Sequence, residues 1–75
     1  MSDKLFKLTR SVTVEEEESI VKSLKSDYPK EFKKAASENG GEDILTILLI
    51  FDYIKKENQD DYISKVENYI TNIKA

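Results

Sequence analysis

Residues 40–58 read GGEDILTILLIFDYIKKEN, and the eight residues from Ile44 to Phe51 are apolar except for Thr46. On a helical wheel, the apolar residues of this stretch cover most of the circumference, which is typical of a helix buried at the centre of a fold. The length of the stretch and its two closing lysines favour a helix over a buried strand. Eight residues fall far short of the ~20 that a membrane helix needs. We therefore expect a core helix over about residues 42–57 and no membrane segment, with part of its surface open to another chain as the alternative.

Two shorter helices are predicted before this core helix. Thr13 and Glu16 have the spacing of a capping box, and apolar residues follow at helical intervals. Pro29 disfavours helical geometry at the residue before it, so we expect one helix over about residues 15–27 and another over 29–38. The glycine pair that follows is a typical helix stop.

A last helix is predicted over about residues 60–74. Its apolar stripe has the heptad-like spacing of Tyr62, Val66, Tyr69 and Ile73. The segment 55–61 has no apolar residue, which favours an exposed turn before this helix. One continuous helix over residues 42–74 is the alternative.

The N-terminal segment 5–14 alternates between apolar and polar residues, which predicts a half-buried β-strand. The candidate strand-pairing residues are Phe6, Leu8, Val12 and Val14. A single strand leaves backbone N–H and C=O groups unpaired, so it would pair with its copy in a dimer or add to a partner's sheet. The alternative is that the segment is an arm or part of a helix. The expected fold is thus one mostly α-helical domain over residues 1–75, a small bundle of three to four short helices preceded by one N-terminal β-strand, which we expect to pair across a dimer.

The composition excludes most kinds of catalytic and metal chemistry. The chain has 75 residues and contains neither Cys nor His, so it has no disulfide, no thiolate or imidazole metal ligand and no usual general base. It lacks a phosphate loop and a calcium loop. A domain of this size rarely encloses a cleft of the ~300 Å³ that substrates occupy. We therefore expect no enzyme activity, no cofactor and no metal, and a small core stabilised by self-association or by a partner.

Acidic and tyrosine side chains are the candidates for contact with a partner protein. The chain carries 12 basic and 15 acidic residues, a net charge of −3, which argues against a nucleic-acid partner. The acidic residues are either solvated helix starts or a surface that imitates phosphate charge, and tyrosine is enriched both at interfaces and at core edges. The candidate interaction residues are Glu15, Glu16, Glu17, Glu18, Tyr53, Asp60, Asp61, Tyr62 and Tyr69.

Two families share parts of this pattern. A strand followed by helices resembles the ribbon-helix-helix repressors, which implies that Lys7, Thr9 and Ser11 would face DNA bases, although that family has a single helix before its glycine turn. The segments TVEEEESIVK and ILTILLIFDYIKK are similar to parts of the ZapA family of cell-division proteins, which lead from a strand into a dimerising helix. That family's N-terminal hairpin turn is missing here, and Pro29 interrupts its first helix.

These features favour a non-enzymatic protein–protein interaction module, a small acidic inhibitor or adaptor that occupies a partner protein's surface. Size and composition suggest a viral or mobile-element origin, and the absence of a signal-peptide pattern makes the cytoplasm of the producing or host cell the expected location. The first alternative is a dimeric DNA-binding regulator that uses its N-terminal strand and the lysines of residues 22–34. The second is a self-assembling structural protein of the cell-division type.

Overall fold

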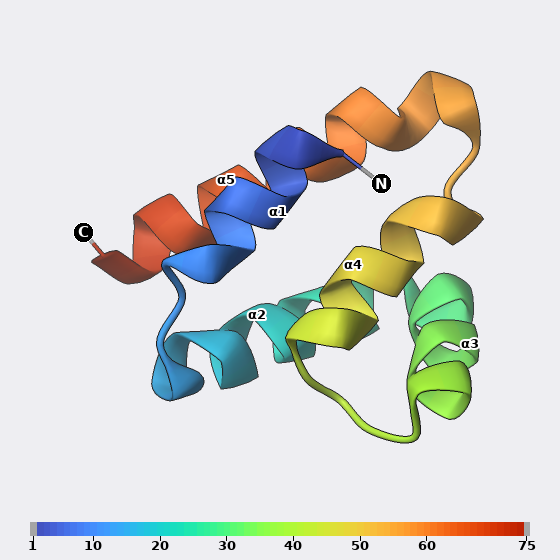
Figure 1. Cartoon of the computed structure of the whole chain (residues 1–75), viewed down its shortest axis with the longest axis horizontal. Coiled ribbons are helices and arrows are strands. Elements are labelled where there is room, and N and C mark those ends of the chain that lie inside the picture. The colour runs from blue at the N-terminus through green and yellow to red at the C-terminus, as the bar shows by residue number, and fades with distance from the viewer. Residues whose placement is uncertain (1, 75) are drawn as a thin grey trace.

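The computed structural model describes residues 2–74, which form five α-helices joined by short connections (Figure 1). The helices are α1 (Asp3–Arg10), α2 (Val14–Asp27), α3 (Pro29–Asn39), α4 (Ile44–Tyr53) and α5 (Gln59–Lys74), and a 3-10 turn, η1 (Lys56–Asn58), precedes α5. The prediction of a mostly helical fold is confirmed. No β-strand occurs within residues 2–74, so the expected N-terminal strand is wrong.

Helix α1 replaces the predicted strand because its residues fit a helical period as well as an alternating one. The Ser2 hydroxyl caps the helix by accepting the Leu5 N–H at 3.4 Å, and Asp3 and Arg10 carry the charges that suit the two ends of the helix dipole. Leu5 and Thr9 are buried against the bundle. Contact with α4 and α5 therefore favours the helix over the strand.

None of the four residues assigned to strand pairing lies on a strand. Phe6 and Val14 are exposed, whereas Leu8 and Val12 pack partly against the core. Val14 is the first residue of α2, and Val12 lies in the connection between α1 and α2. The paired strands on which the ribbon-helix-helix resemblance depends are thus not formed by this segment.

The helix ends around α2 and α3 follow the local sequence signals. The Thr13 hydroxyl accepts the Glu16 N–H at 3.2 Å and the Glu16 carboxylate accepts the Thr13 N–H at 2.9 Å, so the predicted capping box is present. Pro29 is the first residue of α3, and Tyr28 lies between the two helices. Gly40 ends α3 with a φ of 72°, the left-handed conformation that glycine adopts without strain.

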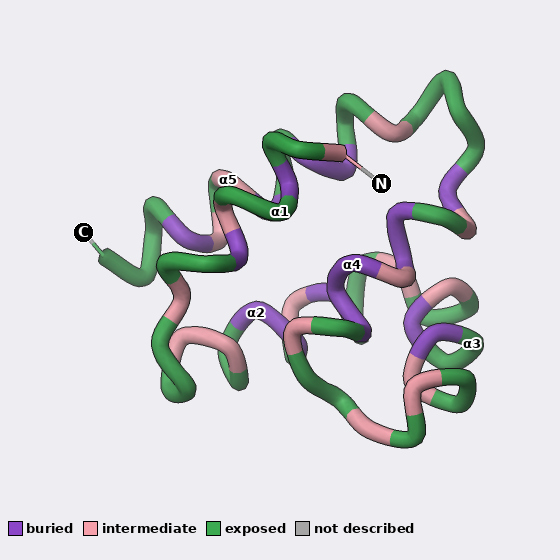
Figure 2. Tube along the Cα trace, viewed as in Figure 1, coloured by how far each residue is buried: buried purple, intermediate pink, exposed green. Residues whose placement is uncertain are grey.

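Helix α4 lies at the centre and contributes more buried residues than any other described helix. Much of it is purple, the colour of buried residues, in Figure 2. Ile47 and Ile50 are fully buried, and Leu48 and Phe51 are nearly so. Helix α3 packs along α4, while α1 and α5 lie side by side and close the core from the other side. Leu45 is the exception in the apolar run, since its side chain is exposed.

The polar segment after α4 separates it from α5, so residues 42–74 form two helices. Helix α4 ends at Tyr53, and Ile54 follows in an extended conformation. The Gln59 amide donates to the Phe51 carbonyl oxygen at 3.2 Å and to that of Ile54 at 3.5 Å. The Phe51 carbonyl oxygen also accepts the Ile54 N–H at 3.3 Å, so the Gln59 bonds add to this helix end and hold the start of α5 against it.

Candidate functional site

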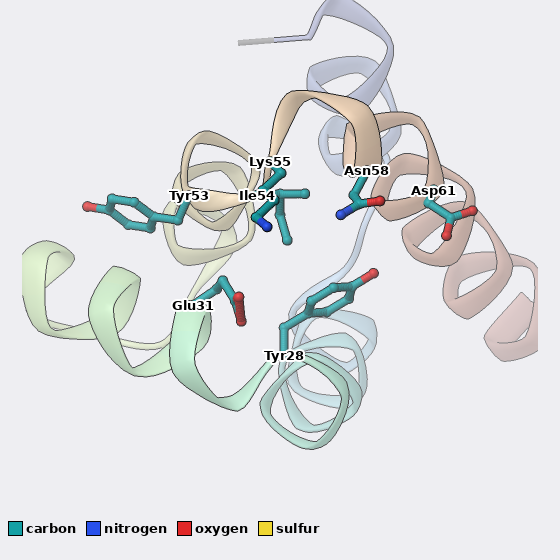
Figure 3. Close-up of a pocket in the computed structure, with 7 residues that line it drawn as sticks. All are labelled: Tyr28, Glu31, Tyr53, Ile54, Lys55, Asn58 and Asp61. Carbon is teal, nitrogen blue, oxygen red and sulfur yellow. The ribbon is translucent and has the colours of Figure 1, made fainter.

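A pocket of about 390 Å³ opens between the α2–α3 junction and the α4–α5 connection (Figure 3). Its volume lies within the range of ~300–1,000 Å³ that is usual for ligand pockets, and is larger than we expected for so small a domain. We call it the junction pocket. Its lining residues are Tyr28, Glu31, Tyr53, Ile54, Lys55, Asn58 and Asp61.

Tyr28 is fixed at the junction pocket by the backbone break that Pro29 imposes. Its N–H donates to the Leu24 carbonyl oxygen at 2.7 Å, which closes the last turn of α2. Its ring meets the ring of Tyr62 edge to face, with 5.3 Å between centroids. The Lys65 Nζ lies 5.1 Å from the Tyr28 ring centroid. Both contacts come from α5, so the Tyr28 ring is held against that helix.

The opposite wall comes from the chain that links α4 to α5. Ile54 is buried and forms the apolar part of this wall, and η1 brings Asn58 beside it. Figure 3 shows Asn58 and Asp61 together with Tyr28 on one side, and Glu31 with Tyr53 on the other. The pocket lining thus combines the apolar Ile54 and the tyrosine rings with charged and polar side chains, which we call its rim.

The rim carries two carboxylates and one ammonium group. Glu31 and Asp61 carry the negative charges and Lys55 the positive one. Within residues 2–74, neither carboxylate makes a hydrogen bond or an ion pair through its side chain. Both carboxylates can therefore accept hydrogen bonds from a cationic group that enters the pocket.

The three tyrosines proposed from the sequence lie in different surroundings. Tyr53 lines the junction pocket, and the Lys34 Nζ lies 4.5 Å from its ring centroid. Tyr62 is fully buried, and its hydroxyl donates to the Ile47 carbonyl oxygen. Tyr69 is half-buried and donates to the carboxylate of Asp27.

The pKa values of Tyr62 and Tyr69 are altered by burial and, for Tyr69, by its hydrogen bond to Asp27. Removal of the Tyr62 phenol from water raises its pKa well above the usual value. The pKa of Tyr69 is also raised, first by burial and then by the hydrogen bond to Asp27. Both side chains stay neutral and hold the helices together, whereas Tyr53 is open to the pocket.

The acidic candidates divide into residues tied to the fold and residues free at the surface. Glu16 belongs to the capping box, and its hydrogen bond from the Thr13 backbone lowers its pKa. The Glu17 carboxylate accepts the Ile44 N–H at 3.1 Å and so joins the starts of α2 and α4. The remaining candidates are exposed, and of these only Asp61 lines the junction pocket; they are Glu15, Glu18, Asp60 and Asp61.

The structure brings Tyr53 and Asp61 together and adds residues that sequence reasoning missed. Glu31 and Asn58 each lie in a polar stretch that contains no recognisable motif. The sequence therefore gives no indication that either residue lines a pocket. Tyr28 is one of the four tyrosines in the sequence and follows the apolar stripe of α2, and the sequence alone does not indicate that it lines a pocket.

The described residues offer no metal site and no membrane helix. Within residues 2–74, no group of three or more Asp or Glu side chains is placed to hold a metal ion. None of the helices in this range is long and apolar enough to cross a bilayer. The junction pocket itself offers Ile54 and the ring of Tyr28 for apolar contact, and the carboxylates of Glu31 and Asp61 for contact with a cation.

Comparisons with protein-family models, with curated protein sequences and with solved structures gave no significant match to this chain.

Proposed function

We propose that this protein is a non-enzymatic interaction module, a small acidic adaptor or inhibitor that occupies the surface of a partner protein in the cytoplasm. In this proposal the junction pocket takes an arginine side chain of that partner. The observation that carries the proposal is the pair of unengaged carboxylates, Glu31 and Asp61, in the lining of a pocket that also contains Ile54 and the ring of Tyr28.

An arginine side chain matches both parts of the pocket. Its methylene stem would lie on Ile54 and on the ring of Tyr28, and this contact would bury apolar surface on both sides. Its guanidinium group would reach the rim, where its five N–H groups can donate to the carboxylate of Glu31 or to that of Asp61. Lys55 repels any cation, but the ammonium group of lysine lacks the planar donor array of a guanidinium group and is more strongly hydrated, so we expect arginine to be preferred.

A titration with a single amino-acid probe tests this assignment. N-acetyl-arginine amide is added to the ¹⁵N-labelled protein, and N-acetyl-citrulline amide serves as the neutral probe of nearly the same shape. We expect amide shifts centred on Tyr28, Asn58 and Asp61 with the arginine probe and none of comparable size with citrulline. A single amino acid makes only a small contact area with the protein. We therefore expect a dissociation constant on the order of 1 mM.

Two variants separate the pocket from the general negative charge of the chain. Glu31→Gln with Asp61→Asn removes both rim charges, and we expect it to abolish the arginine-dependent shifts. Asp60→Asn removes a neighbouring exposed charge that does not line the pocket and is expected to leave them unchanged. Equal shifts with citrulline, or binding that survives the double substitution, would contradict the proposal.

A further inference from the structure

A second hollow, of about 410 Å³, lies on a different face of α3. Pro29, Phe32 and Ala36 form its apolar floor, and Lys33 lies on the same helical face. Lys25 from α2 and Glu42 from the α3–α4 connection complete the lining. We call this surface the α3 groove.

The α3 groove carries a local positive charge on an acidic protein. Lys25 and Glu42 form an ion pair of 3.9 Å, but their side chains are 64% and 50% exposed, so water screens this contact strongly. Lys33 makes no ion pair within residues 2–74. An occupant that carries an apolar side chain beside carboxylates would therefore complement the groove in both respects.

The start of α2 presents such a combination. Val14 is 76% exposed, the largest fraction among the exposed large apolar residues. Glu15 and Glu18 are also exposed; the helical spacing places Glu18 on the face of Val14, one turn further along, and Glu15 next to Glu18 on its other side. Glu16 and Glu17 are held by hydrogen bonds within the fold and point elsewhere. We call Val14, Glu15 and Glu18 the acidic head.

We propose that the acidic head of one copy of this chain docks into the α3 groove of a second copy. Val14 would lie on the floor at Phe32, and the two carboxylates would approach Lys25 and Lys33. Val14 and Lys25 lie near opposite ends of α2, roughly 16 Å apart along the helix, so a chain cannot fill its own groove. The contact is head-to-tail, and repetition of such a contact gives growing chains or a closed ring.

Light scattering behind a sizing column, across a concentration series, measures this association. We expect the mass to rise above the 8.7 kDa of one chain with concentration, and the rise to weaken in high salt. The groove variant, Lys25→Glu with Lys33→Glu, is expected to weaken association about tenfold. The head variant, Val14→Ser with Glu18→Gln, is expected to do the same.

A mixture of the two variants tests the head-to-tail geometry. The groove variant keeps an intact head and the head variant keeps an intact groove, so an equimolar mixture is expected to form two-chain complexes that neither variant forms alone. The matched control is Phe6→Ser with Glu57→Gln, which removes an exposed apolar side chain and a carboxylate outside both surfaces. Circular dichroism confirms that each variant is folded.

Three results would overturn the proposal. The first is a mass of one chain at every concentration, and the second is association that the groove variant leaves unchanged. The third is a variant mixture that stays monomeric while the wild type associates. Each readout is independent of arginine binding at the junction pocket, so the two proposals can fail separately.

Discussion

The hydroxyl of Tyr62 donates a 2.6 Å hydrogen bond to the backbone carbonyl oxygen of Ile47, which lies in a different helix. Both residues are fully buried, and the bond joins α5 to the centre of α4. A buried tyrosine normally finds such a partner because an unpaired hydroxyl in the core is costly. Tyr62 is therefore part of the internal support for Tyr28, whose ring rests against it.

Replacing Tyr62 by phenylalanine should separate this hydrogen bond from the packing of the ring. We expect Tyr62→Phe to lower the free energy of unfolding by about 1 kcal/mol, because the ring stays and only the bond is lost. Urea unfolding followed by circular dichroism measures the change. Tyr53→Phe is the control, since its side chain is only half-buried, and it should have no effect beyond error. Equal stability of the Tyr62 variant and the wild type would show that the bond contributes nothing.

The raised pKa values of Tyr62 and Tyr69 predict a loss of stability in alkali. In the unfolded chain a tyrosine loses its proton near pH ~10, whereas the folded protein holds both phenols protonated above that value. Above this pH the unfolded state binds fewer protons than the folded state, so the free energy of unfolding falls as pH rises. Below it, these two groups contribute no pH dependence.

Thermal unfolding between pH 8 and pH 11 measures this effect. We expect the melting temperature to decline more steeply above about pH 10 in the wild type than in a variant that combines Tyr62→Phe with Tyr69→Phe. The comparison uses the slope rather than the absolute stability, because both substitutions also remove hydrogen bonds. Parallel slopes would mean that neither phenol is protected from ionisation.

The helical elements can be predicted from the sequence where one periodicity dominates. The apolar run of α4 has residues on nearly every side, and its burial follows from that distribution. Residues 5–14 mislead because Phe6 and Leu8 fit an alternating pattern while Leu5 and Thr9 fit a helical one. The choice between the two depends on the surface that α4 and α5 offer to α1, which is a tertiary property.

The junction pocket could not be predicted because its walls are distant in the sequence. Tyr28 and Glu31 flank the break at Pro29, whereas Asn58 and Asp61 belong to the polar segment after α4. The side-chain amide of Gln59 holds this segment against the end of α4 through two hydrogen bonds. Neither the break nor this cap indicates by itself that the two segments face each other.

Thr46, the one polar residue within the apolar run, holds the α3–α4 connection in place. Its side chain is fully buried, and its hydroxyl donates to the Gly41 carbonyl oxygen at 2.7 Å. The same hydroxyl accepts the Asp43 N–H at 3.2 Å and the Asn39 amide at 3.3 Å. One oxygen thus satisfies groups from the end of α3 and from the start of α4.

Substitution of Thr46 by valine keeps the shape of the side chain and removes all three bonds. We expect Thr46→Val to lower the free energy of unfolding by about 1–3 kcal/mol. The groups that bond to the hydroxyl would lose this hydrogen-bond partner in a partly buried site. Thr46→Ser keeps the hydroxyl and should cost about 1 kcal/mol through the lost methyl group. Chemical unfolding measures both. A valine variant as stable as the wild type would contradict this role.

The two glycines after α3 predict opposite responses to alanine. Gly40 has a φ of 72°, a conformation in which a Cβ is strained even though an added Cβ would have no neighbouring atom within 4 Å. We expect Gly40→Ala to cost about 1–2 kcal/mol in the free energy of unfolding. Gly41 is the matched control, because an added Cβ would meet its nearest atoms at 3.9 Å, an ordinary contact. Gly41→Ala should therefore be neutral or slightly stabilising, since it restricts the unfolded chain. Equal losses at both positions would show that the connection depends on flexibility of the pair rather than on the left-handed turn at Gly40.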